Sequence, residues 1–152
     1  MPDEGCYICR KHAGEIDEPG GAIYADDLMV VGHARIAEGQ ETAYLGYLMI
    51  ETRRHVAGLA DLFVDEAATL GVLAARLAQA LQDTEGAEHV YAFVIGDGVP
   101  HLHLHLVPRY PGTPRDYYGP RVDEWPDAPR GGPDAIAAVC DRLREWLAGQ
   151  MD

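Results

Sequence analysis

The chain has 152 residues, of which 47 % are hydrophobic, and it carries a formal net charge of −13 at pH 7. This length fits one domain spanning residues 1–152, and no apolar run approaches the ~20 residues of a membrane helix. The acidic balance argues against binding to nucleic acid polymers, which requires a basic face, but permits a small anionic ligand. Because the N-terminus shows no basic stretch followed by an apolar one, we expect a cytoplasmic protein with no membrane partner.

The N-terminal half predicts short strands and one long helix. Residues 1–20 form a polar, glycine-containing lead-in. Branched and aromatic residues predict strands at 22–25 and 28–32, joined by a turn at Asp26-Asp27, and a further strand at 43–51. From 62 to 82, apolar residues recur at three- and four-residue steps. This spacing predicts an amphipathic helix, with Asp61 or Asp65 as its cap.

The C-terminal half predicts a hairpin, an irregular segment and a final helix. Strands are expected at 89–95 and 101–107, around the turn Gly96-Asp97-Gly98, with Pro108 ending the second. Residues 108–133 contain seven prolines and predict an irregular surface segment. An amphipathic helix is expected over 134–149. Together these elements predict an α+β fold: an antiparallel sheet of about five strands, a long helix packed on it and a C-terminal helix.

The strongest chemical signal is the segment His101-Leu-His103-Leu-His105. Alternate residues of a strand face the same side, so the imidazoles would form a row about 7 Å apart from one to the next. Such a row fits a metal site, or a nucleophile supported by its neighbours. A neutral imidazole is a good nucleophile near neutral pH. The plainer alternative is a polar face of a sheet.

The chain has three cysteines, and two of them form a C-x-x-C pair at Cys6 and Cys9. This pair alone is a weak zinc signal and also fits a redox role. Cys140 lies in an apolar helical pattern, so we expect it to be a small buried hydrophobe.

The run from His101 to Val107 resembles the His-x-His-x-His-x-x motif of the histidine triad (HIT) superfamily, in which x is hydrophobic. The resemblance covers roughly residues 5–110. It implies the HIT-like fold and nucleotidyl hydrolase or transferase activity on a nucleoside phosphate bond, with nucleoside phosphoramidates and dinucleoside polyphosphates among the substrates. Further matching segments are Cys6-x-x-Cys9, Gly14-Glu15-Ile16, Tyr24-Ala-Asp26-Asp27, Arg53-Arg54-His55-Val56 and Leu59-x-x-Leu62.

The resemblance assigns a role to each histidine of the triad. His103 would attack the α-phosphorus and carry the nucleotidyl group, and His105 would contact the phosphate. His101 would fix the tautomer of His103 through its backbone carbonyl, and water would then release a nucleoside monophosphate. Two alternatives stay open: transfer of the nucleotide to phosphate or a sugar phosphate, and a non-catalytic nucleotide-binding module.

The resemblance is to bacterial, zinc-containing members, and it implies a structural zinc held by Cys6, Cys9, His55 and His101. The alternative is a pair of reduced, metal-free thiols. It also implies a homodimer. Weaker candidates for substrate contacts are Ile23 and Leu28 near the base and ribose, Asp97 at the leaving group and Arg109 at a phosphate, although Arg109 also fits a solvated strand end.

The sequence departs from the family pattern in two places. Tyr47 stands where many members carry a fourth histidine. The stretch 94–100 lacks the usual asparagine and the usual Ser, Thr or Gln near the leaving group. These departures concern the choice of substrate and the rate, not the identity of the nucleophile.

Overall fold

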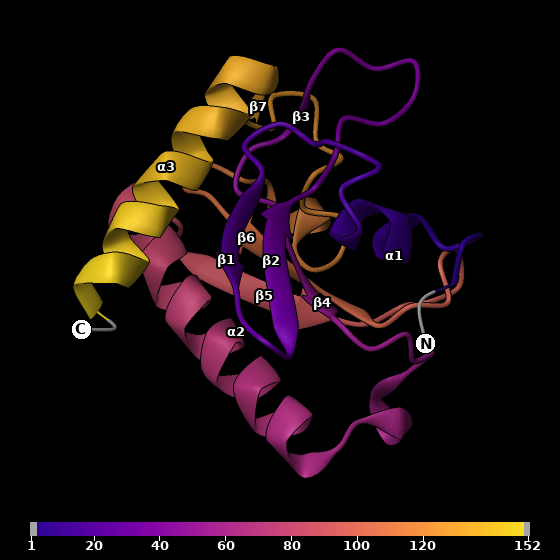
Figure 1. Cartoon of the computed structure of the whole chain (residues 1–152). Helices are drawn as coiled ribbons and strands as arrows, with labels where there is room; N and C mark the ends of the chain where they lie inside the picture. The colour runs from indigo at the N-terminus through magenta and orange to yellow at the C-terminus, as the bar shows by residue number, and fades with distance from the viewer. Residues whose placement is uncertain (1–2, 151–152) are drawn as a thin grey trace.

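The computed structural model describes residues 3–150 and has an α+β architecture built on a five-stranded antiparallel sheet (Figure 1). The strand order is β1-β2-β4-β6-β5. The predicted fold class is therefore confirmed. The bounds are β1 Ala22–Ala25, β2 Met29–His33, β4 Leu48–Thr52, β6 His103–Arg109 and β5 His89–Phe93.

The helices divide between the two faces of this sheet (Figure 1). The long helix α2 (Val64–Glu85) and the C-terminal helix α3 (Pro133–Gln150) cover one face and enclose the main core. The short helix α1 (Tyr7–His12) lies on the other face. This helix falls in the lead-in for which no element was predicted. No helix of the described chain is long and apolar enough to cross a membrane.

The predicted strand over 43–51 is in fact two strands separated by a turn. β3 (Ala43–Tyr44) ends just before Gly46, which has a φ of +86°, and β4 begins only at Leu48. A Cβ at Gly46 would clash with the Tyr110 hydroxyl, so the break needs a residue without a side chain. The alternation of apolar residues gave no signal of this turn.

The long helix begins differently from its prediction. Phe63 is the N-cap residue, and its N–H donates to the carboxylate of Glu66 at 2.8 Å. The expected capping by Asp61 or Asp65 was therefore wrong. A glutamate in the first turn satisfies the free amide from inside the helix instead.

The proline-rich segment is mostly irregular, as predicted, but it contains two short elements. A 3₁₀ turn, η2, spans Arg115–Tyr117, and β7 (Arg130–Gly131) pairs with β3 in a separate two-stranded sheet. Pro108 does not end its strand, because it pairs with Val90 of β5 inside β6. The pairing of β6 with β4 has already ended at Leu106, so the missing N–H of proline breaks no bond on that side.

Candidate active site and metal centre

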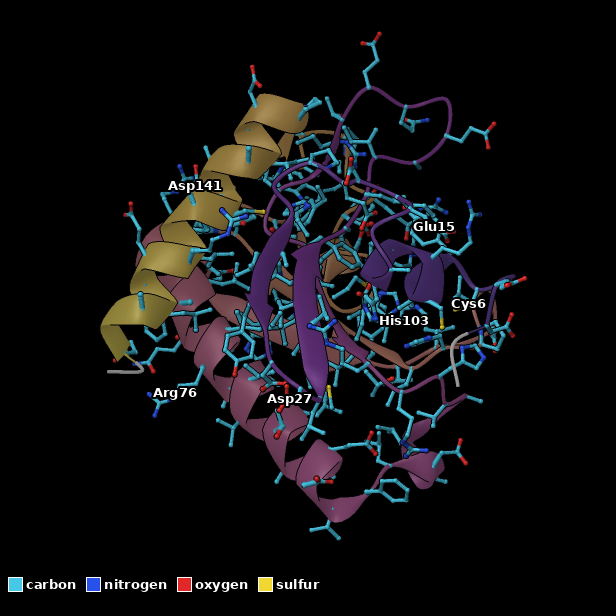
Figure 2. All side chains as sticks on the ribbon, viewed as in Figure 1. Cys6, Glu15, Asp27, Arg76, His103 and Asp141 are labelled. Carbon is cyan, nitrogen blue, oxygen red and sulfur yellow. The ribbon has the colours of Figure 1, made fainter. Side chains whose placement is uncertain are left out.

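His103 is the first residue of β6 and lies half-buried on the same side of the sheet as α1 (Figure 2). Its Nδ1 is 2.7 Å from the backbone carbonyl of His101. A carbonyl only accepts, so Nδ1 carries the ring proton and Nε2 keeps a free lone pair. This is the contact that the family resemblance implied. The imidazole is therefore oriented as a nucleophile needs to be.

His101 lies two residues before β6, so the expected start of this strand at residue 101 was wrong. Its ring meets His12 of α1 and so faces the same side of the sheet as His103. β6 starts at His103, and the His101 side chain is fully buried, with 0 % exposure. Its Nε2–H donates to the carbonyl of Thr52 at 2.6 Å. The ring therefore turns its Nδ1 toward the cysteines rather than joining a row with the other two imidazoles.

His105 packs beside His103, with ring centroids 5.0 Å apart. Its ring stacks on Phe93 at 4.8 Å, and its Nδ1 lies 2.8 Å from the Tyr47 hydroxyl. Burial, with a smaller effect of His103, lowers the pKa of His105 to about 4, so the ring is neutral at physiological pH. Its Nε2 is buried and has no hydrogen-bond partner among the described residues.

The side chains of Cys6, Cys9, His55 and His101 converge on one point. Their candidate ligand atoms all lie within 4.8 Å of one another. The Nδ1 of His101 is 3.4 Å from the Cys6 sulfur and 3.2 Å from the Nδ1 of His55, and the Cys9 sulfur is 3.4 Å from that same His55 nitrogen. A tetrahedral zinc with bonds of about 2.0–2.3 Å would place its ligands about 3.3–3.8 Å apart. The donor set and its spacing therefore fit zinc.

The surroundings of this cluster also suit a metal. The bond from His101 Nε2–H to Thr52 leaves the Nδ1 lone pair free for an ion, and the carboxylate of Asp3 lies 3.7 Å from Nε2 of His55. Cys6 is the N-cap residue of α1, and its sulfur accepts from the N–H of Cys9 at 3.4 Å. A metal here would join α1 to the segment that leads into His103.

A buried carboxylate lies directly opposite the candidate nucleophile. Glu51 of β4 pairs with His103 of β6 and is only 2 % exposed. Lys11 donates to one of its oxygens, and Nε2 of His12 lies 3.0 Å from the other. Lys11 also contacts Glu18 at 2.9 Å. The sequence reasoning missed this network, because Lys11 and His12 lie on the helix that was not predicted.

Two neighbouring cavities open on this side of the sheet. One, of about 190 Å³, is lined by His103 together with Tyr7, Lys11, Arg35 and Glu51. The other, of about 250 Å³, lies over β1 and β2 and shares part of the same charged network; its lining includes Ile16, Ala25, Val30 and Arg53. The candidate nucleophile thus faces a space large enough for part of a ligand.

The weaker candidates for substrate contacts do not gather at His103. Ile23 lies in the main core, and Leu28 is packed against that core. Asp97 is exposed in the turn before His101. Arg109 lies six residues beyond His103, or about 20 Å along the strand, and it pairs with Glu88 at 2.9 Å and Tyr91 at 2.8 Å. Its guanidinium therefore has protein partners of its own.

The α+β sheet with a cysteine–histidine cluster beside two strand histidines defines a histidine triad protein. The HIT domain family matches residues 17–112, and the chain belongs to this family. A comparison with curated protein sequences gave no match.

Solved structures show the same fold. A Zn-bound histidine triad family protein from Mycobacterium smegmatis has a TM-score of 0.70 and 20 % identity over 96 % of this chain and 95 % of its own. A HIT-like protein involved in cell-cycle regulation from Bartonella henselae has a TM-score of 0.71 and 16 % identity, covering 95 % of this chain and 98 % of its own. A hypothetical histidine triad nucleotide-binding protein from Sulfolobus tokodaii has a TM-score of 0.70 and 16 % identity, with coverage of 95 % and 93 %.

Proposed function

We propose that this protein is a nucleotidyl hydrolase in which Nε2 of His103 attacks the α-phosphorus of a nucleoside phosphoramidate or dinucleoside polyphosphate. The observation that carries the proposal is the bond from the His103 Nδ1–H to the His101 carbonyl. This bond leaves Nε2 as the nucleophilic atom, and His103 lines a cavity. Membership of the HIT family and a neighbour named as nucleotide-binding add support for a nucleotide ligand.

The reaction would proceed in two steps at the same phosphorus. The Nε2 lone pair forms a P–N bond, and the bond from phosphorus to the leaving group breaks. A phosphate leaves with the electron pair as an anion, and an amine leaves with the electron pair and takes a proton from solvent. The positive charge that develops on the imidazole of His103 is stabilised by the carbonyl of His101, which accepts from Nδ1–H. Water then attacks the phosphorus and releases a nucleoside monophosphate and free His103.

Cations beside His103 would attract an anionic substrate to a chain of net charge −13. Arg35 lies over the ring of Tyr7, 4.6 Å from its centre, and within residues 3–150 no carboxylate pairs with it. Its guanidinium has a fixed charge and forked donors suited to phosphate. Lys11, by contrast, is already neutralised by two glutamates. Arg35 is thus the cation of this cavity most available to a phosphate.

We also propose that Cys6, Cys9, His55 and His101 hold a structural zinc. Zinc bound by four protein ligands would act as a cross-link and have no open position for a substrate. The residues themselves tie α1 to the segment before β6, and they fix the backbone carbonyl of His101 that orients His103. The cluster would thereby support the reaction without taking part in it.

The test uses a panel of nucleoside phosphoramidates and dinucleoside polyphosphates with the wild-type chain, His103→Ala and His89→Ala. His89 is an exposed histidine on β5 and serves as the matched control. We expect turnover in the wild type and in His89→Ala, and no measurable turnover in His103→Ala. Acid quenching followed by mass spectrometry should show a nucleotidyl mass increase on the wild-type peptide that contains His103.

The contrary outcomes are equally clear. Undiminished turnover in folded His103→Ala would exclude His103 as the nucleophile. If added phosphate yields a nucleoside diphosphate, the protein is a transferase or phosphorylase that uses the same intermediate. Tight binding of a nucleoside monophosphate without turnover of any substrate would identify a binding module.

A further inference from the structure

The hydroxyl of Tyr47, a half-buried tyrosine between β3 and β4, contacts a histidine of the triad. Tyr47 lies one residue before β4, and its hydroxyl is 2.8 Å from Nδ1 of His105. Within residues 3–150 the hydroxyl has no other hydrogen-bond partner. The phenol is therefore committed to one imidazole, and that imidazole lies beside the candidate nucleophile.

The direction of this hydrogen bond follows from the donor and acceptor strengths of the two groups. A neutral imidazole carries one N–H, and a phenol has one O–H and can also accept. If the phenol donates to Nδ1, its proton and the Nδ1 lone pair are both satisfied, and Nε2 of His105 carries the ring proton. If Nδ1–H donates instead, the phenol proton has no acceptor and Nε2 has an unused lone pair. Each arrangement makes one hydrogen bond and leaves one donor without a partner. The first is favoured because a phenol O–H is a better donor than an imidazole N–H, and an imidazole nitrogen is a better acceptor than a phenol oxygen.

The surroundings keep this arrangement rigid. Phe93 stacks on the His105 ring with an interplanar angle of 12°, and Tyr47 meets the same ring edge-on at 73°. Burial, with an added effect of the Asp123 carboxylate, raises the pKa of Tyr47, so the phenol keeps its proton. What remains is a buried N–H on Nε2 of His105 with no partner in the protein.

We propose that Tyr47 is a positioning residue that holds His105 in its Nε2–H tautomer, so that this N–H donates to a phosphoryl oxygen of the group attacked by His103. The proposal rests on the proposed function, because it supplies a donor for charge that develops on phosphorus. A buried polar atom without a partner is expected where a ligand completes the site. The tautomer of His103 is set by a backbone carbonyl, and that of His105 is set by a side chain that can be replaced.

The first experiment measures the tautomer directly and needs no turnover. ¹⁵N NMR of the histidine rings distinguishes a protonated from an unprotonated nitrogen. For wild-type His105 we expect protonated Nε2 and unprotonated Nδ1. Tyr47→Phe should give a mixture of tautomers. Tyr44→Phe is the matched control, since Tyr44 belongs to the same apolar cluster as Tyr47 and its hydroxyl donates to the Pro108 carbonyl at 2.7 Å; it should leave the His105 signals unchanged.

The second experiment measures the consequence for a phosphate ligand. Adenosine monophosphate should shift the Nε2–H resonance of His105 in the wild type. With the best substrate of the panel, Tyr47→Phe should lower kcat by roughly 10- to 100-fold with little change in KM, because a transition-state donor is weakened. Tyr44→Phe should stay within about 3-fold of wild type, a change that would reflect stability alone.

Three results would overturn the proposal: a protonated Nδ1 in wild-type His105, an unchanged tautomer in Tyr47→Phe, or equal losses of kcat in both tyrosine variants. If no nucleotide shifts the Nε2–H resonance of His105, then this N–H does not donate to the phosphate. Failure of the proposed hydrolysis would show instead as an absence of turnover in the wild type, while the tautomer and the ligand-induced shift are measured independently of it.

Discussion

Glu51 is a buried carboxylate that the fold keeps ionised opposite His103. Burial alone would raise its pKa, but the hydrogen bond from His12 and the charge of Lys11 outweigh that effect, and the net pKa is lowered. Removal of a cation from such a pair leaves an uncompensated buried charge. We therefore expect Lys11→Met to lower the free energy of unfolding by about 3 kcal/mol, measured by urea denaturation.

Two comparisons isolate this ion pair. In a Glu51→Gln background, Lys11→Met should lower the free energy of unfolding much less, since no buried charge is left behind. Arg10→Met removes an exposed cation from the same helix, paired with Glu15 at 3.5 Å, and should cost less than about 1 kcal/mol. Equal losses of unfolding free energy in Lys11→Met and Arg10→Met would show that the buried pair stabilises the fold no more than an exposed pair does.

The same pair predicts how stability depends on pH. The folded pKa of Glu51 lies below its ordinary value of 4.5, so the carboxylate contributes stability above pH 4.5 that is lost as the pH falls through the folded pKa. The free energy of unfolding should therefore fall more steeply below pH 4.5 in the wild type than in Glu51→Gln. Denaturant titrations at pH 7, 5, 4 and 3 measure this difference, and parallel curves would exclude Glu51 as a source of the acid sensitivity.

At the scale of residues, spacing alone identified the motif but not its geometry. The alternation around His103 and His105 pointed to chemistry, whereas the position of His101 outside the strand depends on contacts with distant cysteines. Tyr47 was noted only as a departure from the family pattern, and its contact with His105 could not be foreseen. Glu51 gave no signal, because its place opposite His103 arises from the pairing of β4 with β6. Sequence reasoning finds residue types at fixed spacing, and it misses partners that tertiary structure brings together.

Helix α1 is the element whose stability we expect to depend most on the metal. It has only six residues, and an isolated helix of that length is unstable in water. Cys9→Ser should abolish stoichiometric zinc, measured by elemental analysis, and lower the melting temperature by about 10 °C. Cys140→Ser is the control: Cys140 lies buried in α3, outside the cluster, so this variant should bind zinc normally whatever its stability. Full zinc content in Cys9→Ser would exclude the proposed site.

At the scale of elements, apolar periodicity predicted the helices and strands that have one apolar face. It did not predict elements that depend on local contacts. The strands around the Asp26 turn were predicted to within one residue, and the long helix to within three residues at each end. In that turn, Asp26 accepts from the N–H groups of Leu28 and Met29, both at 2.8 Å. Helix α1 has little apolar periodicity of its own and is held by its cysteines and by the bonds to Glu51. No helical pattern in the sequence could have revealed it.

At the scale of the whole molecule, the two faces of the sheet have separate tasks. Figure 2 shows Cys6 and His103 on the side of α1, whereas Arg76 and Asp141 lie on the two long helices. The proline-rich segment covers part of the histidine side, since Val122 and Ala128 pack against Val107 of β6. The helices thus provide the stable core, and the site is built from shorter segments on the other face.

The expected homodimer is a prediction about the edge of this sheet. β5 is an edge strand with one neighbour, β6, and α2 packs against it. Val72 on α2 is 58 % exposed. An unpaired strand edge favours association with a second copy, and Val72 is an exposed apolar residue of the helix that packs on this strand. Light scattering after size exclusion should give a mass of about 33 kDa, twice the 16.6 kDa of one chain.

A charge on this surface should separate the two chains. Val72→Lys would place a desolvated charge in the contact, so we expect a monomer of 16.6 kDa with an unchanged circular dichroism spectrum. Glu145→Lys is the control, because it changes an exposed residue of α3, the helix that packs against β1 at the opposite edge of the sheet. Its mass should remain that of the wild type. A wild-type chain that is monomeric at micromolar concentration would refute the dimer itself, and a dimeric Val72→Lys would place the contact on another surface.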